Sequence, residues 1–164
     1  MVEIKMARVD ERLIHAQIIK KWLETLKCNH VVIVDEEIHN NVFEVDILKM
    51  STPSYVTLYI FDISEALSFF NENTECSSPV LLLVKNIGIL KTLVDMGVAI
   101  KKINIGLITS KVGRKKICSS VYLSEAEQRD VRYFIDMGIT TIAQMVPDSQ
   151  SVDLSKIILA KDTK

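Results

Sequence analysis

Short apolar runs alternate along the chain with longer segments whose hydrophobic residues recur at helical spacing. The runs are rich in β-branched residues, and several are too uniformly apolar to have one face in water, which is typical of strands in a buried parallel sheet. We expect strands at EIKMA (3–7), HVVIVD (30–35), YVTLYIF (55–61), PVLLLV (79–84), KINIG (102–106) and ITTIAQMV (139–146).

The segments between these runs predict helices. After the first run, Ile14, Ile18, Trp22 and Leu26 form a stripe at i, i+4 spacing, opposite a face of lysine and glutamate. Further helices are expected at 42–50, 64–72, 87–97, 124–138 and 151–160. Capping residues and end signals support these boundaries, namely Ser64, Ser124 with Glu127 in capping-box spacing, Gly97 and Gly138, and the acidic residues 35–37 are expected to start another helix.

This alternation predicts an α/β fold, an open and mostly parallel sheet of about six or seven strands with helices on both faces. No tandem repeat, low-complexity tract or Pro/Gly-rich linker divides the chain, so we expect a single domain over residues 1–164. In such folds, ligands bind beyond the carboxyl ends of the strands. The segment that follows the first strand is therefore expected at the functional edge of the sheet.

Composition excludes several classes of protein. A hydrophobic content of 48% and a charged content of 25% indicate a folded chain, and a formal net charge of −1 argues against a nucleic-acid binder. No apolar run is long enough to cross a bilayer or to resemble a signal peptide. Cys28, Cys76 and Cys118 lie far apart without zinc-ligand spacing, so we expect reduced thiols in a cytosolic protein. No strand is followed by GxGxxG or a P-loop, which argues against a nucleotide-binding enzyme.

The chemistry of the sequence is concentrated between residues 8 and 15. Arg8 and Arg12 offer planar forks suited to phosphate oxygens, and His15 lies where the first helix begins, at the end of a helix that favours an anion. Asp10 or Glu11 could accept a hydrogen bond from one imidazole nitrogen and leave the other nucleophilic. These groups suit a transiently phosphorylated histidine. A capping histidine among solvated ion pairs is the alternative, and the residues alone leave both open.

Two motifs decide between these readings through a resemblance. RVDERLIHAQIIKKW (8–22) resembles the R-[IV]-D-[DE]-R-L-I-H-G-Q-[VI] segment of enzyme IIB subunits in the mannose/fructose/sorbose family of the bacterial phosphoenolpyruvate-dependent sugar phosphotransferase system. Residues 104–127 are similar to that family's N-[VI]-G-G-M…G-K…V-x-[VL] loop. Asn104, Ile105, Gly106, Gly113 and Val121 keep its register.

The resemblance implies a role for each matching residue. His15 would carry the phosphoryl group on Nδ1, Arg8 and Arg12 would hold its oxygens, and Asp10 would orient the site. Lys111 and Arg114 are candidate loop contacts. The group would come from a phosphohistidine of enzyme IIA and pass to a sugar presented by the membrane subunits IIC and IID. The resemblance implies a cytoplasmic protein peripherally associated with that transporter, and neither metal nor nucleotide cofactor for the two steps.

Arg114 stands where the family commonly has lysine, which keeps the charge but alters its geometry, and three further positions depart from the family pattern. Ala16 and Leu107 stand where the family has glycine, and Ile87 stands where it often has proline. If the second glycine of the loop takes a positive φ, leucine there would require a rebuilt loop. A regulatory or binding module that kept the fold but lost transfer is therefore the alternative function. The sequence does not identify the sugar, and a homodimer stays open because no self-complementary stripe defines one.

Overall fold

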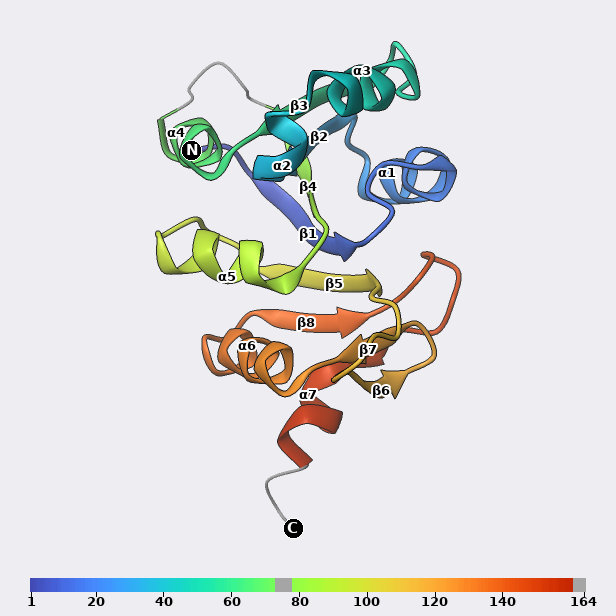
Figure 1. Cartoon of the computed structure of the whole chain (residues 1–164), viewed down its shortest axis with the longest axis vertical. Helices are drawn as coiled ribbons and strands as arrows, with labels where there is room; N and C mark the ends of the chain where they lie inside the picture. Colours follow the sequence, from blue (N-terminus) through green and yellow to red (C-terminus); the bar gives the residue numbers. More distant parts are fainter. Residues whose placement is uncertain (73–77, 161–164) are drawn as a thin grey trace.

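The computed structural model describes residues 1–72 and 78–160, and a seven-stranded sheet runs through them (Figure 1). The strand order is β3-β2-β4-β1-β5-β8-β9, and every neighbouring pair is parallel except β8 and β9. The strands are β1 (Ile4–Asp10), β2 (His30–Val34), β3 (Thr57–Phe61), β4 (Val80–Val84), β5 (Lys102–Leu107), β8 (Thr140–Ala143) and β9 (Val152–Asp153). The expected fold class is confirmed.

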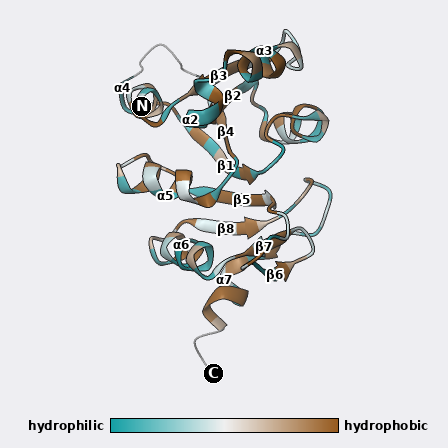
Figure 2. Cartoon of the chain, viewed as in Figure 1, coloured by the Kyte–Doolittle hydropathy of each residue, from teal (hydrophilic) through white to brown (hydrophobic). Residues whose placement is uncertain are grey.

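Helices cover both faces of this sheet. One apolar cluster joins the sheet to η1 (Ile18–Trp22), α1 (Leu23–Leu26), α2 (Glu36–His39) and α3 (Val42–Met50). The other joins it to α4 (Ile63–Glu72), α5 (Ile87–Asp95), α6 (Glu125–Asp136) and α7 (Leu154–Ile158). Hydrophobic residues run along the strands, whereas the helices α4, α5 and α6 mix hydrophobic and polar positions (Figure 2). This is the pattern of a core that lies between sheet and helices.

The strand β1 lies at the centre of the sheet, between β4 and β5. Its side chains alternate between the two faces, since Met6 belongs to one apolar cluster while Ala7 and Val9 belong to the other. Arg8 and Asp10, near the carboxyl end of this strand, are charged and yet have no exposed surface. The chain leaves the sheet directly after them.

All six expected strands form, although the last is shorter than the run 139–146 because the chain turns after Ala143. The basic stretch around Gly113 was expected as a loop, but part of it forms a hairpin of β6 (Lys115–Cys118) and β7 (Val121–Leu123). The segment 151–160 contains β9 before its helix, which begins at Leu154.

The helix boundaries are mostly as expected. Ser124 and Glu127 form the capping box of α6, and Asp35 caps α2 by accepting a hydrogen bond from the Ile38 N–H. The expectation for Ser64 was wrong, because α4 begins one residue earlier and the carboxylate of Asp62 accepts from the Glu65 N–H instead.

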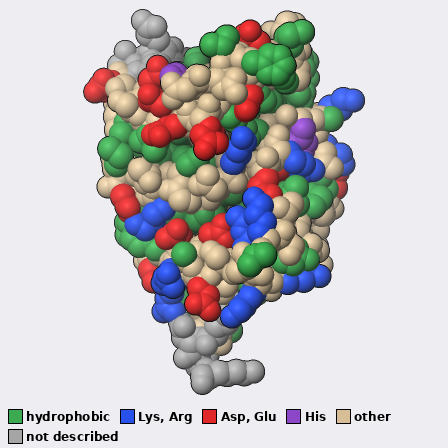
Figure 3. Space-filling view, viewed as in Figure 1, with side chains coloured by type: hydrophobic (Ala, Val, Ile, Leu, Met, Phe, Trp, Pro, Cys, Tyr) green, Lys and Arg blue, Asp and Glu red, His purple; other side chains and the backbone are tan. Residues whose placement is uncertain are grey.

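The helix α3 differs from the others because none of its residues is fully buried. Val45 and Leu48 pack on the core, whereas Val42, Phe43 and Met50 are mostly exposed. Hydrophobic side chains accordingly gather at the upper right of the molecule, over α3 (Figure 3). Within the described residues, no helix is long and apolar enough to span a membrane.

Candidate functional site

A tight turn follows β1 and brings the charged residues together. The Asp10 carbonyl accepts a hydrogen bond from the Leu13 N–H (2.9 Å), and its carboxylate accepts one from the Arg12 N–H (3.1 Å). Leu13 has a φ of 54°, a left-handed conformation that costs about 1 kcal/mol or more for a non-glycine residue. Its side chain is buried, which stabilises by about 2 kcal/mol and holds the turn in place.

Asp10 is the centre of the site, and its carboxylate is completely buried. It accepts hydrogen bonds from Arg8 Nη2 (2.9 Å), Arg12 Nε (2.9 Å) and Arg12 Nη2 (3.0 Å), and Oδ2 lies 3.5 Å from His15 Nε2. Burial alone would raise the pKa of Asp10, but the Arg12 hydrogen bonds and the two guanidinium charges outweigh it and lower the pKa. The carboxylate is therefore ionised and fixed between two arginines.

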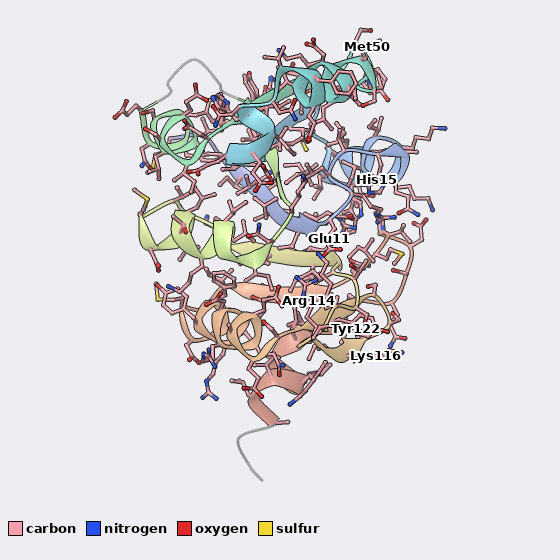
Figure 4. All side chains as sticks on the ribbon, viewed as in Figure 1. Glu11, His15, Met50, Arg114, Lys116 and Tyr122 are labelled. Atoms are coloured by element: carbon pink, nitrogen blue, oxygen red, sulfur yellow. The ribbon has the colours of Figure 1, made fainter. Side chains whose placement is uncertain are left out.

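His15 immediately precedes the first helix, whose helical residues begin at 16 and continue through η1 and α1. Its Nδ1 accepts a hydrogen bond from the Gln17 N–H (3.3 Å), which requires a lone pair on Nδ1 and leaves the proton on Nε2, facing Asp10. Burial lowers the pKa of His15 against the opposing charge of Asp10. The imidazole is therefore neutral near pH 7, and 19% of the His15 side chain is exposed, which leaves the ring accessible. Figure 4 shows His15 close to the helical segment that follows β1.

Arg8 does not lie where a phosphate-holding residue is expected. It is completely buried, and its terminal nitrogens donate to Asp10 and to the carbonyls of Gln144 and Met145, each at 2.9 Å. The guanidinium also lies 4.9 Å above the ring centroid of Trp22. Since both terminal nitrogens are occupied inside the protein, Arg8 supports Asp10 rather than facing an incoming phosphoryl group.

The position of Arg8 depends on two residues of β5. A Cβ atom on Gly106 would lie only 1.9 Å from Arg8 Nη2, so glycine makes room for the guanidinium. Asn104 pairs with Arg8 in the sheet register, and its Oδ1 accepts from the Gln144 N–H (3.1 Å). Asn104 thereby holds the segment whose carbonyls receive Arg8. Both residues belong to the second sequence motif, and the structure shows why that motif accompanies the first.

The other candidate basic residues differ in how exposed they are and in how close they lie to His15. Arg12 bonds Asp10 through two nitrogens, and 35% of its side chain is exposed, with Nη1 at 3.3 Å from Gln17 Oε1. Lys111 is 64% exposed and lies 3.6 Å from Glu11. Arg114 is mostly buried between Glu11 and Glu127 rather than free to meet a phosphate. Arg12 is thus the candidate arginine that is both exposed and beside His15.

The three departures from the family pattern are accommodated without strain. Leu107 ends β5 in ordinary extended backbone, pairs with Asp10, and its carbonyl accepts from the Glu11 N–H (3.2 Å). Ala16 is helical and exposed. Ile87 begins α5 behind the N-cap Asn86. The rebuilt loop that Leu107 was expected to require is therefore not needed.

Several features lie apart from His15. A hollow of about 460 Å³ beside α1 is lined by residues that include Ile19, Leu23 and Tyr55 but not His15. Among the described residues, the group that could hold a metal ion is His39, Asp62 and Glu65, beyond the end of β3, where His39 pairs with Glu65.

Neither of the two cysteines within the described residues is bonded to a residue of the His15 site. Cys28 and Cys118 are free and half-buried, and burial raises the pKa of Cys28 to about 11, which keeps it a thiol. Cys76 lies outside the described residues.

Sequence reasoning missed the segment 144–149. It acts mainly through backbone carbonyls, since Met145 O accepts from both Arg8 and the Trp22 indole (3.2 Å). No side-chain pattern marks a carbonyl. Thr109 was also missed, and its hydroxyl donates to Glu11 at 2.6 Å. A polar residue two positions beyond the end of β5 was the available signal for it.

Comparison with known proteins identifies the family. The family model described as the PTS system sorbose subfamily IIB component matches residues 4–164. The chain belongs to this family. Among solved structures, that of manxB from Thermoanaerobacter tengcongensis matches with a TM-score of 0.89 and 32% sequence identity. The match covers 97% of this chain and 96% of that one.

Curated relatives point to the same family. This IIB component is 25% identical to the fructose-specific EIIB component of Bacillus subtilis, over 96% of this chain and 97% of the relative. It is also 26% identical to the mannose-specific EIIAB component of Escherichia coli, over 94% of this chain and 48% of that protein. Family membership thus agrees with the resemblance that the two sequence motifs carry.

Proposed function

We propose that this IIB component carries a phosphoryl group on His15 Nδ1 between a phosphohistidine donor and a sugar. The observation that carries the proposal is the arrangement of the imidazole: a neutral ring, with Nε2 facing a buried carboxylate and a lone pair on Nδ1. This is how a histidine nucleophile is oriented by a third group.

The chemistry follows from this orientation. The Gln17 N–H first releases Nδ1. The Nδ1 lone pair then attacks phosphorus, the P–N bond of the donor breaks, and the donor histidine recovers its lone pair. The His15 ring then carries the phosphoryl group on Nδ1 and a proton on Nε2, so it is an imidazolium that Asp10 stabilises. When the sugar hydroxyl attacks, the P–N bond breaks and neutral imidazole leaves. The hydroxyl proton is released to a base.

Two groups supply the electrostatic stabilisation. Arg12 is exposed beside His15, and its outer nitrogens can turn from Gln17 and Asp10 toward phosphoryl oxygens. The N-terminus of the helical run 16–26 adds N–H groups, one of which already points at Nδ1. Arg8 acts indirectly, because its hydrogen bond and charge keep Asp10 ionised.

We also propose the partners of this transfer. We assign phosphorylated enzyme IIA as donor, and a relative whose name joins EIIA and EIIB in one chain supports that pairing. We assign the membrane subunits IIC and IID, with their bound sugar, as acceptor. This places the protein in the cytoplasm, peripherally associated with the transporter. Positioning and charge stabilisation do most of the work in phosphoryl transfer, and the proposal uses no metal or nucleotide at this site.

Phosphorylation in a reconstituted chain tests the proposal. The wild-type chain is incubated with phosphoenolpyruvate, the general phosphotransfer proteins and its cognate IIA, and intact mass is measured before and after mild acid. We expect one acid-labile phosphoryl group on wild type and on the control His39→Ala, and none on His15→Ala. A wild type without phosphate, or a His15→Ala variant that gains as much as wild type, would refute the assignment.

A further inference from the structure

Arg114 lies between two carboxylates that come from distant parts of the chain. Its Nη1 donates to Glu11 Oε1 (2.9 Å), while Nε and Nη2 donate to Glu127 at 3.1 and 2.7 Å. The three side chains are only 14%, 20% and 18% exposed, so water screens these contacts poorly. Glu11 belongs to the turn after β1, and Glu127 belongs to the capping box of α6.

A turn anchored to the sheet presents this arginine. The Arg114 N–H donates to the Lys111 carbonyl (3.0 Å), and Gly113 has the positive φ of 85° that such a turn requires. The hairpin that follows is fixed to the chain beyond β5 by two backbone hydrogen bonds. The Ile108 N–H donates to the Ser120 carbonyl, and the Ile108 carbonyl accepts from the Tyr122 N–H. Arg114 Nη1 also donates to the Thr109 carbonyl (3.0 Å).

The same segment holds Glu11 by a second route. Its carboxylate accepts hydrogen bonds from the N–H and the hydroxyl of Thr109, at 3.2 and 2.6 Å. Glu11 is bonded covalently to Asp10 and Arg12, the residues that orient and face His15. A shift of Glu11 therefore moves both of them. Figure 4 shows Glu11 at the end of β1 with Arg114 on the side of the hairpin.

We infer that Arg114 is a positioning residue for phosphoryl transfer. It fixes Glu11 against α6, and Glu11 fixes the turn that aims Asp10 and Arg12 at His15. The inference rests on the proposed function and adds Arg114 to the residues that position the site. It replaces the expectation that Arg114 meets the phosphoryl group itself.

The fork of arginine explains why one residue suffices. Three of its nitrogens reach two carboxylates and one carbonyl at once. Lysine keeps the charge but presents a single nitrogen, so it cannot reach both carboxylates with the same geometry. Without the positive charge, Glu11 and Glu127 would repel each other across a poorly hydrated gap. The Glu11 carboxylate would then keep Thr109 and the exposed Lys111 but lose its mostly buried partner.

Single-turnover transfer from phosphorylated IIA tests the inference. The dependence on IIA concentration gives a limiting rate and a half-saturating concentration for each variant. For Arg114→Gln we expect a limiting rate about tenfold to a hundredfold lower, with the half-saturating concentration unchanged, because misplaced groups slow the chemical step. Arg114→Lys should recover part of the rate. Lys115→Gln, which loses an exposed pair with Glu125 next door, should match wild type.

A double variant separates coupling from general damage. Since Arg114 acts through Glu11, the variant Glu11→Gln with Arg114→Gln should be no slower than the slower single variant. Multiplied effects would overturn the inference. So would a raised half-saturating concentration at an unchanged limiting rate, which would make Arg114 a docking residue, or a loss that merely follows the folded fraction measured by thermal unfolding.

Hydrogen exchange gives a readout that does not need phosphate. The amides of Arg12 and Leu13 are bonded to Asp10 in the turn. Arg114→Gln should lower their protection, whereas Lys115→Gln should not, and equal protection in all three proteins would contradict the inference. If wild type accepts no phosphate, the proposed function fails, and hydrogen exchange alone decides whether Arg114 holds the turn.

Discussion

The carboxyl ends of β1 and β2 have a similar backbone arrangement but differ in the charges that surround them. Each strand finishes in a run of buried residues and leads to a buried aspartate, Asp10 or Asp35, that accepts a backbone N–H and starts the next element. Asp10 is surrounded by two arginines and a histidine. Asp35 is followed by Glu36 and Glu37 and lines a hollow of about 300 Å³ together with them.

The difference shows that position in the fold does not by itself make a site. Both ends lie where open parallel sheets bind ligands. At β1 the surrounding cations hold the carboxylate ionised and leave a neutral histidine at the surface, which suits an incoming anion. At β2 the local charge is mostly negative, with Lys85 and Asn86 the other polar residues that line the hollow, and the aspartate serves as a helix cap. The same substitution at the two ends should therefore have consequences of very different size.

The largest difference is expected for aspartate to asparagine. Asp10→Asn leaves the buried Arg8 without its counter-charge, so we expect the free energy of unfolding to fall by about 3–5 kcal/mol, together with loss of phosphoryl transfer. Asp35→Asn keeps a side-chain oxygen that caps α2, so the change should stay within about 0.5 kcal/mol, with transfer unaffected. Urea unfolding and transfer assays measure both. Equal costs at the two ends would break the comparison.

Glycine to alanine should give the next largest difference. Gly106→Ala places a methyl group 1.9 Å from the Arg8 guanidinium, so Arg8 must leave its carbonyl and carboxylate partners, at a cost of about 2 kcal/mol or more. Gly88→Ala lies in the first turn of α5, beyond the end of β4, where the nearest atom is at 3.4 Å. There we expect a gain of up to about 1 kcal/mol from helix propensity. Thermal unfolding of both variants checks the two signs.

Much of the fold could be predicted because its strands are short apolar runs and its helices carry one apolar face. The β6–β7 hairpin could not, since Lys115 and Lys116 are exposed and its register depends on Ile108, which pairs with Val121. A hairpin with a wet, basic strand gives the same local pattern as a loop.

Which residues belong to the site could be predicted from the sequence better than how those residues are arranged. The motif identified Arg8 as a member, but its burial depends on Gly106, Asn104 and carbonyls about 136 residues away. No local pattern contains these contacts. A charged residue is ordinarily exposed unless it is paired, and the pairing here is long-range.

A smaller effect is expected on the pH dependence of stability. The pKa of His15 is lowered in the fold, so the unfolded state binds the proton more readily as pH falls. The contribution of His15 to the free energy of unfolding is fully present above about pH 6.5 and is lost as pH falls through the folded pKa. Urea unfolding from pH 8 to 5 should therefore show a steeper acid-side loss in wild type than in His15→Ala. An identical slope would indicate that His15 titrates as it does in the unfolded chain.

A related effect is expected at more acid pH. The arginines lower the pKa of Asp10, so its stabilising charge is present above about pH 3.9 and is lost only as pH falls through the lower folded value. Acid unfolding of wild type should therefore include a proton uptake below about pH 3.9. If proton uptake during acid unfolding is instead complete above that pH, Asp10 is not held as the structure shows.

The nitrogen that carries the phosphoryl group tests the central claim most directly. With ¹⁵N-labelled histidine, long-range ¹H–¹⁵N correlation distinguishes the two ring nitrogens of His15 before and after phosphorylation. The structure leads us to expect the Nε2–H form before transfer, and phosphorus on Nδ1 with the proton still on Nε2 afterwards. Phosphorus on Nε2, the nitrogen that faces Asp10, would contradict the account.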